Sequence, residues 1–166
     1  MGHKALFYRI VYFSTMIYND LSGTWKGETI VPGHLRTQGT DKVDEFFLRI
    51  KQDYERLTFT GIFMGNPESS GNPEHGSVVG EVVDGPKVYF ETRFSKFYFY
   101  LDHHEQEVAT SDKDINSKIK YSGNLIKQDM LIGEWEFEQT MFEFQGMVRK
   151  TQPWYGKWWQ KKCLGN

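Results

Sequence analysis

The side chains most suited to chemistry lie in one short run, from Asp102 to Glu105, which reads Asp-His-His-Glu. Imidazoles and carboxylates are ordinary protein ligands of zinc and related ions. Adjacent histidines on a strand point to opposite faces, so this run could bind one ion only from a loop, with help from His34 or His75. Because the remaining ligands would have to come from elsewhere in the chain, we expect no metal centre and no cofactor.

Glutamates form a second group, in which Glu134, Glu136 and Glu138 alternate along one predicted strand. Together with Glu143 they could supply the carboxylate pair of an acid–base site. Like charges at every second position are more typical of the solvated face of a strand. The sequence also contains no nucleophile elbow, phosphate-binding glycine loop or zinc-binding helix motif. These patterns favour a protein that is not an enzyme.

Aromatic and basic side chains are mixed in residues 151–166, which we expect to form a tail outside the main fold. Three of the five tryptophans lie within six residues, at Trp154, Trp158 and Trp159, and lysines lie between and beside them. Such a segment suits an aromatic anchor in a protein interface, a membrane interface or a stacking surface for single-stranded nucleic acid. Alternatively, it packs over the mouth of the fold and buries its tryptophans. We expect these three tryptophans to bind a protein partner or a second copy of the chain.

The composition limits the class of protein. The chain has 166 residues, 39% hydrophobic and 25% charged, which suits one globular domain and excludes a disordered tail protein. Cys163 is the only cysteine, which excludes an internal disulfide framework and a thiolate zinc cluster. The net charge is −2, and basic residues without acidic ones occur together only after Met147. The protein as a whole therefore lacks the basic face that nucleic-acid binding requires.

An apolar run occupies most of residues 1–20, from Ala5 to Tyr18, and only Arg9 interrupts it with a charge. Its fourteen residues are fewer than the roughly 20 that a membrane-spanning helix needs. We expect a short helix or strand packed on the rest of the domain, in a cytoplasmic protein. The alternatives are a signal or anchor, or the end of a membrane helix, through which the protein would associate with a membrane.

The remaining sequence predicts strands. Aromatic residues make up 16% of the chain, which also contains 16 glycines, a composition typical of strands and turns. Asp84-Gly85 is the strongest hairpin signal. Eight or nine short strands follow one another at about ten-residue spacing, and a meander of hairpins favours a closed barrel, which leaves no exposed edges. We therefore predict an all-β protein, with a single antiparallel meander barrel of about eight strands over residues 21–150. The predicted strands are 21–30, 46–51, 57–63, 77–83, 87–94, 97–101, 115–125, 131–138 and 141–150.

A short motif occurs twice, as Gly23-x-Trp25 and Gly133-x-Trp135. A glycine two residues before a tryptophan on a strand lets another backbone pass closely while the indole fills one end of a barrel. The indole N–H then needs an acceptor, and a cation can stack on the ring. Both tryptophans are therefore expected to close the barrel.

The first motif, near the start of a meander that ends with a basic residue, resembles the calycin group of lipocalins and fatty-acid-binding proteins. Residues 119–125 and 132–135 are also similar to hairpins of bacterial lipocalin-like domains of unknown function. The resemblance implies that Trp25 closes the barrel floor beneath a basic residue of the final strand, a role matched by Arg149 or, failing it, Lys150. Unlike secreted lipocalins, the chain has no clear amphipathic helix after the last strand and no disulfide pair.

A barrel of about eight strands has room for its own side chains or for one small ligand. The numerous phenylalanines could fill it completely. The resemblance instead implies a non-enzymatic module that binds or senses a small, partly apolar or anionic molecule, anchored by arginines and tyrosines. The alternative is a filled barrel that binds a protein partner through its tail and its N-terminal segment. The expected ligand-binding residues are Arg49, Phe59, Phe90, Arg93, Tyr98, Tyr100 and Tyr121.

Overall fold

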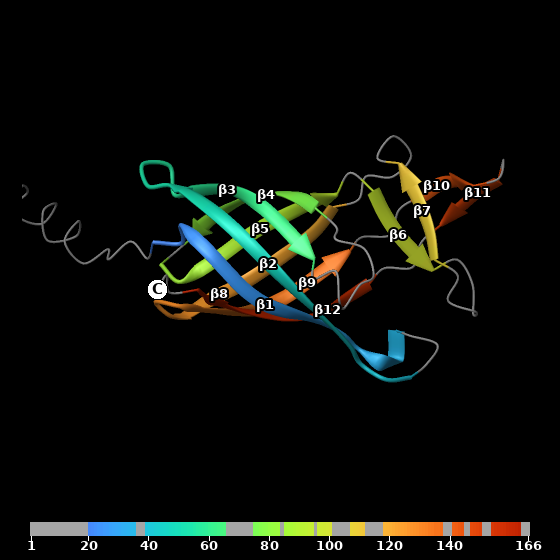
Figure 1. Cartoon of the computed structure of the whole chain (residues 1–166), viewed down its shortest axis with the longest axis horizontal. Coiled ribbons are helices and arrows are strands. Elements are labelled where there is room, and N and C mark those ends of the chain that lie inside the picture. The colour runs from blue at the N-terminus through green and yellow to red at the C-terminus, as the bar shows by residue number, and fades with distance from the viewer. Residues whose placement is uncertain are drawn as a thin grey trace, which may run out of the picture.

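A computed structural model shows a closed β-barrel with two smaller hairpins beyond one end (Figure 1). It describes residues 20–35, 39–65, 75–83, 85–94, 96–100, 107–111, 118–137, 141–144, 147–150 and 154–163. Of the predicted N-terminal segment, 1–20, only Asp20 is among these residues. No helix in these ranges is long and apolar enough to cross a membrane.

Eight strands form the barrel, in the order β1-β12-β9-β8-β5-β4-β3-β2, and every neighbouring pair is antiparallel. This arrangement confirms the predicted all-β fold. The barrel strands are β1 (Gly23–Val31), β2 (Lys42–Asp53), β3 (Thr58–Gly65), β4 (His75–Val83), β5 (Lys87–Phe94), β8 (Lys118–Lys127), β9 (Met130–Phe137) and β12 (Trp154–Lys162). A single 3-10 turn, η1 (Gly33–Leu35), follows β1.

The two hairpins interrupt the meander at the same end of the barrel. Strands β6 (Lys96–Tyr100) and β7 (Glu107–Ser111) form one two-stranded sheet, and β10 (Met141–Phe144) and β11 (Met147–Lys150) form the other. We call this end of the barrel the hairpin end and the opposite one the floor (Figure 1). The predicted strands 97–101 and 141–150 therefore exist in part, but they lie outside the barrel.

The prediction that the barrel ends at residue 150 was wrong. Residues 154–162 are not a tail docked on the outside, because β12 lies between β1 and β9 and closes the barrel. Gly156, Trp158 and Gln160 are buried, while Lys157, between the first two, and Lys161, after Gln160, are exposed. This is the alternation of a barrel strand. The mixture of tryptophans and lysines thus reflects two faces of one strand.

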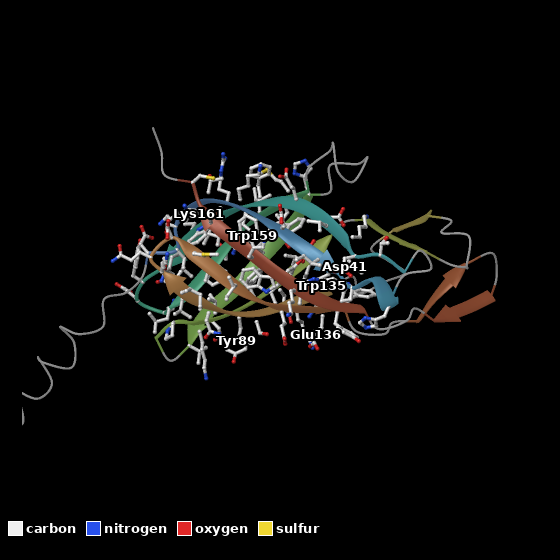
Figure 2. The ribbon with its side chains drawn as sticks, turned by 90° about the horizontal axis from the view of Figure 1, so that it is seen from below. Asp41, Tyr89, Trp135, Glu136, Trp159 and Lys161 are labelled. Carbon is white, nitrogen blue, oxygen red and sulfur yellow. The ribbon has the colours of Figure 1, made fainter. Side chains whose placement is uncertain are left out.

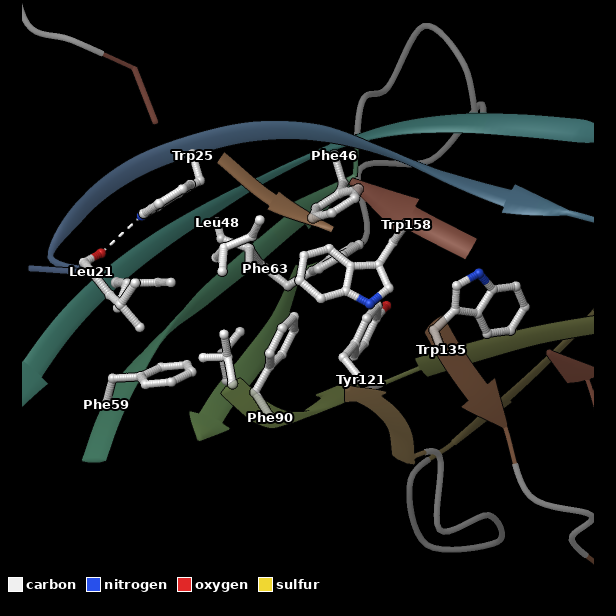
Figure 3. Close-up of a cluster of buried hydrophobic side chains, with 14 of the residues drawn as sticks. Leu21, Trp25, Phe46, Leu48, Phe59, Phe63, Phe90, Tyr121, Trp135 and Trp158 are labelled. Atoms are coloured by element: carbon white, nitrogen blue, oxygen red, sulfur yellow. Dashed lines mark hydrogen bonds between the residues drawn. The ribbon is translucent and has the colours of Figure 1, made fainter. Parts of the chain in front are cut away.

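Aromatic side chains fill much of the interior, and several of them lie against inward-facing glycines. A Cβ atom on Gly80 would lie 2.3 Å from the Phe59 ring, and one on Gly123 would lie 2.5 Å from the ring of Trp158. Large side chains therefore pack over glycines on the adjacent strand or on the next strand but one. Figure 3 shows this cluster. The buried apolar residues are Leu21, Trp25, Val31, Phe46, Leu48, Ile50, Phe59, Phe63, Val78, Val88, Phe90, Tyr121, Leu131, Trp135, Phe137 and Trp158.

Candidate functional site

The floor of the barrel is closed by Trp25, which is fully buried. Its indole N–H donates to the carbonyl oxygen of Leu21 at 2.8 Å, drawn as a dashed line in Figure 3. The Nζ atom of Lys162 lies 5.8 Å from the centre of the ring, within reach of a cation–π interaction. The expected pair of tryptophan and cation is therefore present, with Lys162 as the cation. Arg149 lies on β11, outside the barrel, because the final barrel strand is β12.

Hydrogen bonds hold residues 20–22 beneath Trp25. The Gln52 Oε1 atom accepts from the Leu21 N–H at 2.7 Å, and the Gln52 N–H donates to Ser22 Oγ at 3.0 Å. Lys162 Nζ donates to the Asp20 carbonyl oxygen at 2.6 Å. The floor is thus a network in which side chains bind the backbone groups of the segment that enters β1.

A tyrosine completes the outer rim of the floor. The Tyr54 hydroxyl donates to Asp20 Oδ1 at 2.6 Å. This bond, helped by the Ser22 N–H and the Lys162 ammonium and opposed by burial, holds the pKa of Asp20 below its ordinary value of 3.8. The same bond raises the pKa of Tyr54 above 10.0. The bond therefore favours an ionised Asp20 carboxylate and a neutral Tyr54 hydroxyl.

Three of the predicted ligand-binding residues meet inside the barrel. Phe90 and Tyr121 stack with ring centres 4.4 Å apart, and Phe59 lies 6.1 Å from Phe90. Trp158 contacts the stacked pair with its edge, 5.4 Å from Phe90. These side chains form a packed apolar cluster inside the barrel.

The two predicted cationic anchors, Arg49 and Arg93, point out of the barrel and not into it. Arg49 is exposed, because its neighbours Leu48 and Ile50 face the interior. Arg93 is exposed for the same reason, beside the buried Thr92, and its guanidinium lies 3.6 Å from the Glu91 carboxylate. The interior therefore receives no charge from either arginine, and neither can anchor a ligand there.

Other predicted positions lie on the hairpins or outside the barrel interior. Tyr98 and Tyr100 belong to β6, and their side chains are outside the described part of the structure. The run from Asp102 to Glu105 is outside it as well. Glu136 is exposed and points away from the barrel (Figure 2), and Glu134 is exposed too. Within the described ranges, no group of three or more metal-binding side chains occurs.

The predicted interface tryptophans differ from one another. Trp158 is buried, and its N–H donates to the Glu134 carbonyl oxygen at 3.0 Å, so it belongs to the core and not to an interface. Trp159 lies on the outer face of β12, near Lys161 in Figure 2, and donates to Glu28 Oε2 at 3.0 Å. The side chain of Trp154 is outside the described residues.

Sequence reasoning missed Gln160, which is fully buried on the inner face of β12. Neither Nε2 nor Oε1 of its amide has a hydrogen-bond partner among the described residues. The hydroxyl of Thr92, also fully buried, and the N–H of Trp135 are in the same condition. The signal in the sequence was the row Gly156, Trp158, Gln160, in which a polar amide follows an apolar inner position.

The candidate site is the inner wall that carries these unpaired groups. By register, Gln160 lies opposite Leu131 near the floor, whereas Trp135 lies four residues further along β9 and Thr92 lies opposite Ile119, toward the hairpin end. Amide, hydroxyl and indole groups are neutral and bind through hydrogen bonds. Trp135, expected as a second plug, is buried on the inner wall toward the hairpin end: its register partners are Tyr121 and Gly156, and its Nε1 atom would lie 2.7 Å from a Cβ on Gly156. The site is a wall of stacked aromatic rings with a few neutral polar groups, which suits a small molecule with an apolar body.

Comparisons with known proteins assign no family. No protein-family model matches the chain, and no curated protein matches its sequence. The eight-stranded antiparallel closed barrel is consistent with a calycin-like fold.

Proposed function

We propose that this protein is a non-enzymatic binding module that holds a small neutral molecule inside its barrel. The observation that carries the proposal is the set of unpaired polar groups on the inner wall, from Gln160, Thr92 and Trp135. A buried polar group without a partner costs about 1–3 kcal/mol, and native proteins keep few of them. A bound molecule that pairs with one of these groups would reduce the cost, and Gln160, near the floor, lies apart from Thr92 and Trp135, toward the hairpin end.

The charges near the interior favour a neutral ligand over the anionic one expected from the sequence. Arg49 and Arg93 are outside. Lys162 binds Asp20 at the floor, and Lys42, near the hairpin end of β2, lies 3.2 Å from the Asp44 carboxylate. Burying an anion without a free cation nearby would be unfavourable. The half-buried Asp44 carboxylate, whose Oδ1 has no hydrogen-bond partner in the described part of the chain, disfavours an anion further. The proposed ligand is therefore partly apolar and not anionic.

A second candidate is a filled barrel that acts through its outer surface. The aromatic rings that pack against Gly80 and Gly123 favour this alternative. The outer face of β12 would supply the contact, since Trp159 is partly exposed there between Lys157 and Lys161. A protein partner or a second copy of the chain would bind this face.

Native mass spectrometry of the purified protein separates the two candidates. The binding module predicts an excess mass in the native spectrum that disappears when the protein is denatured. A native mass equal to that of the bare chain, together with no stabilisation by small neutral ligands, would contradict it. For the second candidate, Trp159→Ala should abolish self-association or partner binding, with Tyr89→Ala, at an exposed position of β5, as the matched control.

A further inference from the structure

The residues that lie beside Gln160 on the neighbouring strands explain why its amide is unpaired. On the register of the barrel its partners are Gly27 of β1 and Leu131 of β9, neither of which has a polar side chain. A Cβ on Gly27 would lie 2.6 Å from the Cβ of Gln160, so the glycine leaves space for this side chain. The neighbouring strands therefore provide room for the amide and no partner for it.

The nearest indole groups are already used. Trp25, two residues closer to the floor on β1 than the Gln160 partner Gly27, donates its N–H to the Leu21 carbonyl oxygen. Trp158, the preceding inner residue of β12, donates to the Glu134 carbonyl oxygen. Both rings contribute apolar surface near Gln160, but neither N–H is available to its Oε1 atom. The amide is therefore open to a bound molecule that supplies its partners.

A primary amide places a hydrogen-bond donor and an acceptor side by side in one plane. Its best complement is a group with the reverse pair, such as the edge of a lactam or of another carboxamide. A ketone offers only an acceptor and would leave Oε1 unpaired. An ionised carboxylate also offers only acceptors, and its charge would be buried without a cation.

We propose that Gln160 recognises a ligand through an amide-type edge, and that the class of ligand is a small neutral lactam or carboxamide. This inference rests on the proposed function, because it assumes that the interior binds a molecule. The two amides would form a pair of hydrogen bonds, while Trp25 and Trp158 contact the apolar part of the ligand.

Two five-membered rings of nearly equal size test the proposal: 2-pyrrolidinone, which has the lactam edge, and cyclopentanone, which has only the acceptor. Titration followed by NMR chemical shifts measures both affinities. For the wild-type protein we expect 2-pyrrolidinone to bind about tenfold more tightly than cyclopentanone, the effect of about one hydrogen bond. In Gln160→Met, which keeps the shape of the side chain, this ratio should fall to about one. Lys157→Met, on the outer face of the same strand, is the matched control and should keep the wild-type ratio.

The outcomes separate this inference from the proposed function. If both rings bind but the wild-type ratio is about one, or if Gln160→Met keeps it, Gln160 does not read an amide edge, although the barrel binds ligands. If neither ring binds and the native mass is that of the bare chain, both proposals fail. If Gln160→Met does not fold, Gln160→Leu and a crystal structure with 2-pyrrolidinone replace it. Ordered water alone against Gln160 in that crystal would overturn the inference.

Discussion

Two buried glutamines on the inner wall of the barrel differ in the hydrogen bonding of their side-chain amides. Gln52, at the floor, accepts a hydrogen bond from the Leu21 N–H and lies 7% exposed, whereas Gln160 is 0% exposed and its amide has no partner in the described structure. The side chains are identical, so the difference lies in what the neighbouring chain supplies. At the floor, residues 20–22 bring free backbone groups to the amide. On β12, the neighbouring backbone is already paired in the sheet.

The comparison teaches that a buried polar side chain has a structural role where free backbone groups form hydrogen bonds with it. Where the backbone offers no such groups, the side chain is available to a ligand. The floor uses its polar groups to stay shut, with Trp25 above them. The inner wall near Gln160 and Thr92 keeps its polar groups unpaired. We expect the two regions to respond in opposite ways to mutation.

The largest effect is expected for Trp25→Ala, which removes the plug of the floor. Trp25 is fully buried and its N–H is bonded, so both packing and a hydrogen bond are lost. We expect the free energy of unfolding to fall by about 3–5 kcal/mol. Urea denaturation followed by far-UV circular dichroism measures it. Trp159→Ala, on the outer face, should cost much less, and an equal loss in the two variants would show that the floor is not special.

The same substitution at the two glutamines tests the comparison directly. Gln52→Met leaves the Leu21 N–H buried without an acceptor, and we expect it to destabilise the protein by about 1–3 kcal/mol. Gln160→Met removes an unpaired amide from an apolar setting. In ligand-free protein it should be neutral or stabilising, with a melting temperature equal to or a few degrees above that of the wild type. Destabilisation of similar size in both variants would mean that Gln160 has a structural partner.

A smaller effect is expected for Lys162→Met, because Lys162 is partly exposed at the edge of the floor. The variant loses the bond to the Asp20 carbonyl oxygen and the contact with the Trp25 ring. We expect a loss of roughly 1 kcal/mol in the free energy of unfolding, reduced by solvent screening. Lys157→Met is the control, and Lys162→Arg should recover part of the loss. If Lys162→Met loses no more free energy of unfolding than Lys157→Met, Lys162 does not stabilise the floor.

The smallest expected effect is on the loss of stability at acidic pH. The Tyr54 hydrogen bond lowers the pKa of Asp20 in the folded protein, so ionised Asp20 contributes stability above its ordinary pKa of 3.8. That contribution is lost as the pH falls through the lower, folded value. Thermal melts across this acidic range should therefore show a steeper fall for the wild type than for Asp20→Asn. Because Asp20 is exposed, the difference should be smaller than the effect of Lys162→Met. Parallel curves would show that the Asp20–Tyr54 bond does not stabilise the folded state.

The sequence predicted the barrel because the signals for strands and turns lie within short stretches of the chain. Alternating side chains, hairpin turns and the Gly23-x-Trp25 motif each act within one strand or one turn, and together they favoured a closed meander. The order of strands at the closure is not local. The mixture of lysines and tryptophans in β12 suggested a surface segment, although in the strand Lys157 and Lys161 lie on the outer face while Trp158 is buried.

The candidate site was predicted in part for the same reason. Phe59, Phe90 and Tyr121 lie on the apolar sides of their strands, and they are inside. Arg49 and Arg93 were chosen for their chemistry, against the alternation that places them outside, and a shift of one residue along a strand reverses the face. Whether Gln160 finds a partner depends on which strands lie next to β12. Neighbours such as Gly27 cannot be identified from the sequence of β12 alone.

The position of β12 has a consequence for how the protein folds in the cell. Its pairing with β1 joins segments that are distant in the sequence, and such nonlocal contacts form slowly. While a ribosome is still synthesising residues 154–162, β1 and β9 each have an unpaired edge, which is a template for pairing with other chains. The hydrophobic interior can already be collapsing at this stage. The period of greatest aggregation risk thus ends only when the final strand of the barrel has been made and inserted.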